Sequence, residues 1–362
     1  MPPSADARPP VGETDVVIRG AGPVGCALAA ALRDSNLRVT VADRGGAAAP
    51  FRPIALSYAS RLILERLGAW QGLVVTPIET IQVSERGAFG RARLDAADAG
   101  VPALGYVTDY ASLARVLRER VAGLISPDET PARCVVHAEG VAPDASEKRY
   151  AQDAVVGIVS VAPQAGGAAF ERFTADGPLA LLPFAGRYAL VWSARPERAA
   201  ALAAAPEAEF LAELAAAAGS APGRPVACEA RSVQPLSLRV NPARIGPREV
   251  FIGNAAQSLH PVAGQGLNLG LRDAWELAET LRDAADPGDA ATLARYAARR
   301  RLDAAATIRV TDFLASAFLG SPGPLHAARS AARGVALMAL DVFPPARRFF
   351  ARRMIYGPSA LP

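Results

Sequence analysis

Cysteine is scarce in this chain of 362 residues, which contains only Cys26, Cys134 and Cys228. Three cysteines so far apart are too few for a disulfide framework and too scattered for a metal site. The sequence therefore predicts neither a metal site nor a disulfide framework, and it favours a reducing compartment.

Long apolar segments are missing as well. No stretch approaches the roughly 18 uninterrupted apolar residues that indicate a membrane-spanning helix. Residues 1–14 are rich in proline, carry Asp6 and Glu13, and have no apolar signal core. We expect a flexible tail over residues 1–14 and a cytoplasmic protein.

Nor is there a large excess of one charge. The 39 lysine and arginine residues nearly balance the 35 acidic residues, and the net charge of +4 is spread along the chain. This pattern does not predict a nucleic-acid partner. With 51% hydrophobic and 20% charged residues, the chain is typical of a globular protein that is long enough for two domains.

The N-terminal part contains a dinucleotide-binding fingerprint. A strand over residues 15–19 leads directly into a G-x-G-x-x-G sequence, a helix follows up to Leu32, and a second strand, residues 38–42, ends at Asp43. The first glycine allows the tight turn, the second lets a pyrophosphate approach the backbone, and the third lets helix and strand pack. A carboxylate about 20 residues further on accepts the ribose hydroxyls. The predicted cofactor contacts are Gly20, Gly22, Pro23, Gly25, Asp43 and Arg44.

A second glycine-rich segment lies over residues 250–274. A short apolar strand, residues 250–252, precedes a polar loop with His260-Pro261 and Gly264-Gln265-Gly266, and a helical pattern then reaches Leu281. The amide N–H groups that open such a helix favour an electron-rich ligand. An ordinary turn before a glycine-rich helix is the alternative interpretation.

Together these segments resemble the aromatic flavoprotein monooxygenases and, within them, the ubiquinone-biosynthesis hydroxylases of the UbiH/UbiF/VisC type. The resemblance covers most of the chain, including residues 20–25 (FAD pyrophosphate motif), 52–70 (R-x-x-A-L-S and L-G-x-W), 169–173 (A-x-E-R-F), 177–183 (G-P-L-A-L-L-P) and 250–274 (second flavin motif). With Asn254, Gln257 and His260, the last motif is most similar to that of the UbiH branch, which hydroxylates a polyprenyl methoxyphenol.

The resemblance implies an α/β fold: a Rossmann-like FAD-binding domain similar to that of para-hydroxybenzoate hydroxylase, an inserted β-sheet substrate domain and C-terminal helices. The expected FAD-binding domain comprises residues 15–75, 106–153 and 245–320. The substrate domain comprises residues 76–105 and 154–244, and residues 321–362 form a C-terminal helical segment.

The implied function is FAD-dependent hydroxylation of a polyprenylated methoxyphenol in ubiquinone biosynthesis. NADPH or NADH would be the reductant, and O2 would be activated as a flavin C4a-hydroperoxide. Two alternatives stay open: a hydroxylase of a smaller soluble phenol, and a non-catalytic flavin-binding scaffold. The expected partners are the apolar prenylated phenol and a ubiquinone-biosynthesis complex.

The resemblance also implies roles for residues of the second motif. Asn254 would hydrogen-bond the ribityl chain, Pro261 would lie beside the flavin ring, and the N–H groups of residues 264–268 would stabilise reduced flavin. His260 is either a residue that holds the turn or a proton relay with a pKa suited to neutral pH. Arg52 is either a surface charge or a phosphate clamp. His260 and Pro261 are the catalytic candidates, and the expected flavin contacts are Arg52, Asn254, Pro261, Gly264, Gln265, Gly266, Leu267 and Asn268.

Two departures from the family pattern concern the nicotinamide side more than flavin binding. Glu139 stands where the family has an aspartate before a glycine, and no clear Ser-x-x-Arg segment follows it. The segment over residues 121–132 is also shorter than the corresponding segment of the family, which contains extra strands.

The remaining patterns predict strands over residues 154–161, 179–182, 188–192 and 231–238. Residues 196–218 predict one alanine-rich surface helix that ends at Gly219. Further helices are expected over residues 273–284 and 290–319. The last segment, residues 346–355, alternates arginine pairs with apolar pairs. It is either a solvated terminal helix or a basic amphipathic foot on the inner, anionic face of a membrane.

Overall fold

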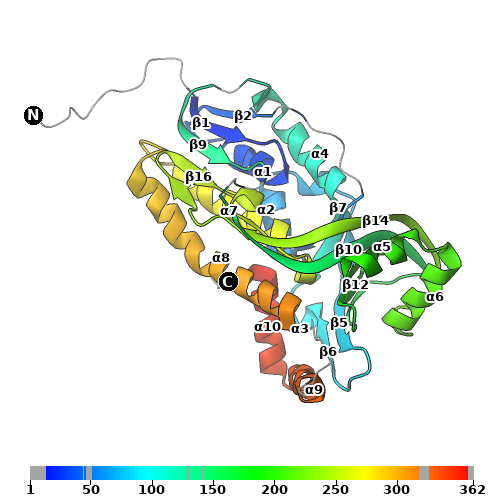
Figure 1. The fold of residues 1–362 in the computed structure, drawn as a ribbon. Helices are drawn as coiled ribbons and strands as arrows, with labels where there is room; N and C mark the ends of the chain where they lie inside the picture. Colours follow the sequence, from blue (N-terminus) through cyan, green and yellow to red (C-terminus); the bar gives the residue numbers. More distant parts are fainter. Residues whose placement is uncertain are drawn as a thin grey trace, which may run out of the picture.

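The computed structural model describes residues 14–43, 45, 51–128, 130–140, 142, 144–317 and 326–357. Arg44 and residues 1–13 of the predicted tail lie outside the described residues. Within the described part, the chain forms three β-sheets with helices packed around them (Figure 1).

The first sheet has six strands in the order β15-β16-β9-β1-β2-β8. The strands are β1 (Thr14–Arg19), β2 (Val39–Ala42), β8 (Ile125–Ser126), β9 (Ala132–His137), β15 (Ile245–Gly246) and β16 (Glu249–Phe251). From β16 to β8 all neighbouring pairs are parallel, which confirms the predicted strands at the N-terminus. Ligands of parallel sheets bind outside the carboxyl ends of the strands. Gly20, Asp43 and Gly253 follow those ends here.

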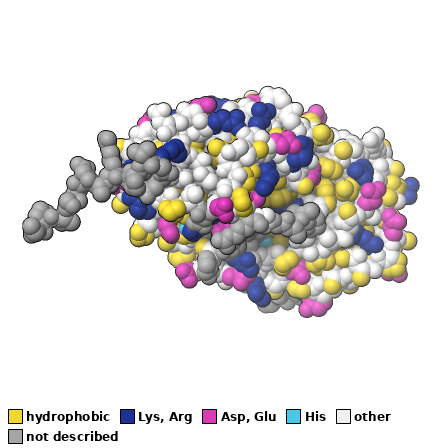
Figure 2. Space-filling view, turned by 90° about the horizontal axis from the view of Figure 1, so that it is seen from above, with side chains coloured by type: hydrophobic (Ala, Val, Ile, Leu, Met, Phe, Trp, Pro, Cys, Tyr) yellow, Lys and Arg dark blue, Asp and Glu magenta, His cyan; other side chains and the backbone are white. Residues whose placement is uncertain are grey.

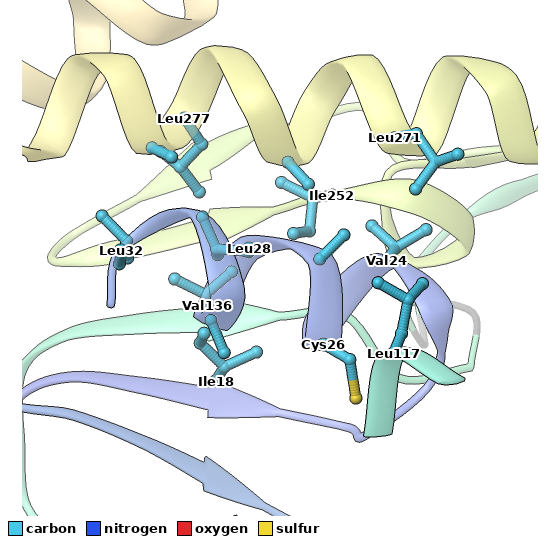
Figure 3. Close-up of a cluster of buried hydrophobic side chains, with 14 of the residues drawn as sticks. Ile18, Val24, Cys26, Leu28, Leu32, Leu117, Val136, Ile252, Leu271 and Leu277 are labelled. Atoms are coloured by element: carbon cyan, nitrogen blue, oxygen red, sulfur yellow. The ribbon is translucent and has the colours of Figure 1, made fainter. Parts of the chain in front are cut away.

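Helix α1 (Pro23–Ala31) lies between this sheet and helix α7 (Gln265–Leu281), as Figure 3 shows. Leu28 of α1 is fully buried and belongs to a cluster with Ile18 and Val136 of the sheet and Leu277 of α7. Burying a leucine side chain contributes about 2 kcal/mol. The stack therefore fixes α1 and α7 relative to the sheet, although their starting residues are more than 200 positions apart in the sequence.

The largest sheet has eight strands in the order β17-β14-β10-β13-β12-β11-β5-β6. The strands are β5 (Thr80–Glu85), β6 (Arg91–Asp95), β10 (Ser146–Ala162), β11 (Ala168–Phe173), β12 (Pro178–Phe184), β13 (Arg187–Ala194), β14 (Arg224–Val240) and β17 (Gln257–Ser258). Strands β10 and β14 have 17 residues each and pair along most of their length. They run from the first sheet into the substrate region (Figure 1). The predicted domain boundary at residues 153–154 falls inside β10, and the domain limits stay predictions.

Two helices cover the outer face of the large sheet, where the sequence predicted one. Helix α5 (Pro196–Ala204) and helix α6 (Glu207–Ala218) are separated because Pro206 forces the preceding Ala205 into an extended conformation (ψ 145°). The prediction of a surface helix is also incomplete, since Phe210 and Leu214 are fully buried against Trp192 and its neighbours.

The third sheet joins the other two. It consists of β3 (Pro53–Ser57), β7 (Gly105–Asp109) and β4 (Thr76–Ile78), and it is flanked by α2 (Tyr58–Arg66), α4 (Tyr110–Arg120) and the short α3 (Ala96–Ala99). Four 3₁₀ turns complete the connections: η1 (Trp70–Gly72), η2 (Ala122–Leu124), η3 (Gly253–Ala255) and η4 (Val262–Gly264).

The C-terminal part is helical, with α8 (Ala290–Ala317), α9 (His326–Val342) and α10 (Pro344–Tyr356). The first of the two interpretations expected a simply solvated helix, but one side of α10 is buried. Its Ala351 and Ile355 are buried in a cluster with Leu94 and Leu104. The other side of α10 is exposed, including Phe349. Among the described residues, no helix is both long and apolar enough to cross a membrane.

Candidate active site

The first loop of the site lies between β1 and α1. Gly20 has φ +105°, a conformation that favours glycine. A Cβ on Gly25 would lie 2.1 Å from the carbonyl oxygen of Gly20, so only glycine lets the helix start this close to the strand. No side chain caps α1, and Pro23 occupies its first turn. The N–H groups of this helix start therefore have no capping side chain, an arrangement that suits the ligand-binding role the fingerprint predicts.

Asp43 stands at the end of β2, beside this loop. Its carboxylate accepts a hydrogen bond from Arg118 of α4 at 2.5 Å, and its backbone N–H donates to the carbonyl of Ser126 in β8 at 3.0 Å. The shortened segment over residues 121–132 therefore still contributes a strand, β8, next to the predicted ribose-binding carboxylate. The sequence did not single out Arg118, because nothing local marks its pairing with Asp43.

Arg52 belongs to the same region. Its guanidinium lies 5.6 Å from the centre of the Tyr110 ring, and a Cβ on Gly22 would lie 3.6 Å from the Tyr110 hydroxyl. Arg52 is exposed. The structure thus places this arginine and a tyrosine that the sequence missed beside the pyrophosphate loop, which supports the phosphate-clamp interpretation.

The second flavin motif meets the first through a close helix contact. A Cβ on Gly270 of α7 would lie 2.7 Å from Val24 Cγ2, and a Cβ on Gly253 would lie 3.1 Å from Val24 Cγ1. Figure 3 shows Val24 directed toward α7. The two glycine-rich segments, distant in sequence, therefore form one site, and the ordinary-turn interpretation of residues 250–274 does not account for this contact.

The loop before α7 presents several predicted contacts at its surface. Asn254 and Pro261 are exposed, and Gly264, Gly266 and Leu267 are half-buried. No side chain caps α7, whose N-cap is Gly264. The loop therefore offers an exposed amide and an uncapped helix start, as a ligand with a polar chain and an electron-rich edge requires.

The side chain of Asn268 forms hydrogen bonds within the protein, whereas its neighbours in the loop are predicted to contact the flavin. Its side chain accepts hydrogen bonds from Ser57 N–H (2.8 Å) and the Ser60 hydroxyl (2.7 Å), and it donates to the carbonyls of Ala55 (2.8 Å) and Gly264 (2.7 Å). The side chain is thus fully occupied in tying α7 to β3. Only its backbone N–H stays a predicted flavin contact.

Gln257 likewise supports the loop from behind. Its amide donates to Asp273 Oδ2 at 2.7 Å, and its carbonyl accepts from Arg244. Asp273 is fully buried and also accepts from Gly253 N–H at 3.3 Å and from Arg300 at 2.8 Å. The family-like glutamine therefore positions the motif and is not directed at the ligand.

His260 is fully buried, and its Nδ1 accepts a hydrogen bond from Val262 N–H at 3.1 Å. The Nε2 atom has no hydrogen-bond partner among the described residues. The ring packs edge-on against Tyr150, with ring centres 5.0 Å apart. Burial lowers the pKa of His260 to about 4, so the imidazole is neutral at pH 7 with its proton on Nε2. A relay that titrates near neutral pH is therefore excluded for this histidine, while a neutral donor is not.

The residues present fit a flavin dinucleotide. Two uncapped helix starts, a glycine cradle that a Cβ would fill and a carboxylate at the end of β2 lie at one end of the first sheet and the helices packed on it. Among the described residues, no cluster of histidine, cysteine or acidic side chains could hold a metal ion.

Comparisons with known proteins decide the family. A family model described as "FAD binding domain" matches residues 130–311. The ubiquinone hydroxylase UbiL of Rhodospirillum rubrum is 33% identical, over 93% of this chain and 88% of its own length. The chain belongs to the FAD-dependent hydroxylases of the ubiquinone-biosynthesis type. The 3-demethoxyubiquinol 3-hydroxylase of Escherichia coli is 30% identical, over 80% of this chain and 86% of its own length.

A solved structure shows the same fold. A variant of HpxO from Klebsiella pneumoniae, complexed with FAD, matches 96% of this chain and 100% of its own chain with a TM-score of 0.76 at 15% identity. The hydroxylase is thus an FAD-dependent monooxygenase with the fold that the sequence predicted. Membership of the UbiH branch stays a prediction, as do the individual flavin contacts.

Gly25→Ala tests the first loop of this hydroxylase. Forcing a Cβ into a packed site costs about 1–3 kcal/mol, so we expect FAD affinity to fall by about 10- to 100-fold. The measurement is the dissociation constant from quenching of flavin fluorescence. Gly123→Ala is the matched control, because a Cβ at Gly123 meets nothing within 4 Å. Equal FAD affinity in the two variants would contradict the assignment.

Proposed function

We propose that this hydroxylase adds an oxygen atom to the aromatic ring of a polyprenylated methoxyphenol in ubiquinone biosynthesis. NADPH or NADH is the reductant, and O2 is the oxygen source. The observation that carries the proposal is the likeness, over most of both chains, to relatives named as hydroxylases of ubiquinone and of 3-demethoxyubiquinol. The two glycine-rich loops support it, because Val24 packs against Gly253 and Gly270 and so brings the loops together, as a single dinucleotide site requires.

FAD supplies the chemistry that side chains cannot, since the reduced flavin reacts with O2 and delivers an electrophilic oxygen atom. The chain binds and orients the cofactor. The N–H groups at the start of α1 and the Arg52 guanidinium hold the pyrophosphate, and Asp43 holds the ribose. Asn254 bonds the ribityl chain, and the N–H groups of residues 264–268 stabilise negative charge on the flavin ring.

An apolar face supports the prenylated substrate. Ala154, Val156 and Leu236 are buried on the inner face of the large sheet, and Phe51 packs against them from the segment before β3. Phe51 also contacts Phe184 of β12, with ring centres 5.6 Å apart. Aliphatic and aromatic side chains of this kind stabilise an apolar chain by removing it from water.

His260 acts as a neutral hydrogen-bond donor in this proposal. A fully buried Nε2–H that makes no hydrogen bond costs free energy. His260 belongs to the same motif as Gly253 and Asn254. We assign it to the substrate oxygen or to the reactive oxygen at the flavin, where one more donor holds the reacting groups in register.

The exposed side of the C-terminal helices supports peripheral contact with an anionic membrane surface. Val342, Phe343 and Phe349 are 73%, 58% and 62% exposed. Helix α10 contains no acidic residue, and its Arg348 and Arg352 are exposed. Apolar side chains that enter the lipid interface beside arginines are typical of membrane-surface helices. A membrane contact would also bring the site close to a prenylated substrate.

The first test of the proposal is turnover of paired substrates. Each buried CH2 group contributes about 0.8 kcal/mol, so one prenyl unit on a methoxyphenol should raise kcat/KM by about 100-fold or more. Product formation and NAD(P)H oxidation are measured with the prenylated and unprenylated phenol. Faster turnover of the unprenylated phenol would favour the smaller soluble substrate instead. In cells lacking the protein, the accumulated quinone precursor identifies the hydroxylated position.

His260→Ala should uncouple the reaction. Without the Nε2–H donor, NAD(P)H oxidation continues while the fraction that yields hydroxylated product falls, by about 10-fold for one lost donor at a water-excluded site. Coupling is the ratio of product formed to NAD(P)H consumed. Since the pKa of His260 is about 4, the wild-type pH profile between pH 6 and 8 should owe nothing to this ring. Unchanged coupling in the variant would contradict the donor role. His260 would then only hold the turn, through the hydrogen bond that it accepts from Val262 N–H.

Charge reversal tests the membrane contact. Deleting α10 would expose the core around Ala351 and Ile355, so substitution is the better test. Arg348→Glu with Arg352→Glu should weaken binding to vesicles that contain anionic lipid, since each basic residue contributes about 1 kcal/mol at such a surface. Arg115→Glu on exposed α4 is the control. Equal sedimentation of both variants with the vesicles would exclude this helix as the contact.

A further inference from the structure

Glu171 of β11 lies on the inner face of the large sheet, among mostly apolar neighbours on the adjacent strands. Glu171 of β11 pairs with Ala180 of β12, Ala180 pairs with Val191 of β13, and Val191 pairs with Val156 of β10. Side chains directly opposite each other in a sheet lie on the same face. Since neighbouring strands are about 4.8 Å apart, Glu171 lies about 14 Å across this face from Val156.

This face reaches the flavin loop through Ala55 of β3. A Cβ on Gly264, the N-cap of α7, would lie 3.2 Å from Ala55 Cβ. Ala55 itself packs in a cluster with Ala169 and Leu182. Ala169 is two positions before Glu171 on β11, and Leu182 is two positions after Ala180 on β12, so these residues share its face. Glu171 therefore lies two positions along β11 from Ala169, whose cluster includes Ala55 beside the loop expected to hold the flavin ring.

The carboxylate of Glu171 has neither an ion-pair nor a hydrogen-bond partner in the described part of the chain. Burial alone raises the pKa of this carboxyl to about 7. Glu171 is half-buried by solvent exposure. A carboxylate that is withdrawn from water without a partner destabilises a fold. Its presence on a face directed at the site is the pattern expected of a functional group.

The other charged groups on the elements around Glu171 already have partners. Glu85 shares the face two positions beyond Val83 on β5 and accepts from Arg333 of α9 at 3.0 Å. Asp109 of β7 caps α4 through Ser112 N–H at 3.0 Å. Arg347 of α10 forms an ion pair with Asp98 at 2.8 Å. Of strands β3, β4, β12 and β13, only β13 contributes a charged side chain to this face. This is Arg187, four positions before Val191, and it pairs with Glu229 of β14 at 3.1 Å. Tyr356 of α10 packs against Tyr58.

We propose that Glu171 is the catalytic base of this hydroxylase and accepts the proton of the substrate's phenolic hydroxyl. This assignment rests on the proposed function, because it requires a phenol as substrate. The Glu171 side chain contacts the hydroxyl from the sheet while the ring lies between the sheet and the loop at Gly264.

The proton transfer is balanced over one turnover. The phenolic O–H bond breaks, an O–H bond forms on the carboxylate of Glu171, and the electron pair stays on the phenol oxygen. The resulting phenolate is more electron-rich and attacks an electrophilic oxygen atom faster. After oxygen transfer the ring carbon loses its hydrogen as a proton, which is taken up by the oxygen atom that leaves as water. The ring oxygen recovers a proton from the Glu171 carboxyl, which returns to the carboxylate. The second oxygen atom of O2 leaves as water, with the two electrons from NAD(P)H.

The test compares Glu171→Gln with Glu229→Gln in the full-length FAD-loaded enzyme. Glutamine keeps the size of the side chain but cannot take up a proton. Glu229 is an exposed carboxylate of the same sheet, on β14, so it controls for the loss of one charge. The ligands are a prenylated methoxyphenol and its methyl ether, which lacks the O–H group. Binding is followed by the change in flavin absorption, and turnover by product.

Because Glu171 is protonated below about pH 7 and cannot then accept a proton, wild-type kcat/KM should rise as the pH increases through about 7. Glu171→Gln should lower kcat by about 10²- to 10⁴-fold, the usual contribution of a general base. It should also abolish that rise and lose the preference for the phenol over its ether, with FAD affinity unchanged and a melting temperature that is not lowered. Glu229→Gln should keep all of these properties.

A Glu171→Gln enzyme with wild-type turnover, pH profile and ligand preference would overturn the role of Glu171 and leave the proposed function intact. A wild-type enzyme that binds neither ligand and does not hydroxylate the phenol would overturn the substrate class and, with it, this role. The ligand-binding measurement separates the two failures, because it does not require turnover.

Discussion

The site depends on the close approach of α1 to the segment around Gly253 and Gly270. Val24 occupies the space that a side chain at either glycine would fill. This contact brings the loop before α1 close to the loop before α7. The buried cluster with Leu28 and Leu277 extends the same packing along both helices. Apolar packing thus sets the distance between the two halves of a polar binding site.

A buried charge network fixes the second half in place. Asp273 accepts from Gly253 N–H, Gln257 and Arg300, and Asp303 links Arg300 to Arg272 through contacts of 2.7 and 2.8 Å. Burial alone would raise the pKa of Asp303, but Arg272 and Arg300 lower it below its usual value. Removing one member would leave a buried charge without a partner, at a cost of about 3–5 kcal/mol. The network therefore makes the conformation of the flavin motif depend on α8 as well as on α7. Charged side chains are not confined to this buried network. On the face displayed in Figure 2, acidic and basic side chains are interspersed over the outer surface.

The sequence predicted the parts of the site that depend on local backbone geometry. Gly20, Gly22 and Gly25 stand at a strand-helix junction, and a fixed spacing is enough to recognise them. Side-chain partners across the fold were not predictable in this way. Nothing near Tyr110 or Arg118 indicates that these side chains contact Arg52 and Asp43, because the contacts exist only once α4 packs beside α1. The sequence predicted a flavin contact of Asn268 through its backbone N–H and used Gln257 only as a mark of family likeness, so the bonds of both side chains within the protein were not foreseen.

The same limit applies to the substrate side. The A-x-E-R-F motif identified Glu171 as part of a family pattern, but the pattern does not reveal which face of the sheet the side chain occupies. The strand register reveals this face. Ala180 lies opposite Glu171 and Val191 lies opposite Ala180, while the alternate residues Phe170 and Trp192 pack under α5 and α6. Strands β10 and β14 pair along most of their length, with three register shifts, and β13 and β12 connect them to the strand that carries Glu171. A carboxylate held in this way needs no conformational change to meet a ring placed between the sheet and α7, and the low exposure of its surroundings keeps water from competing for the proton.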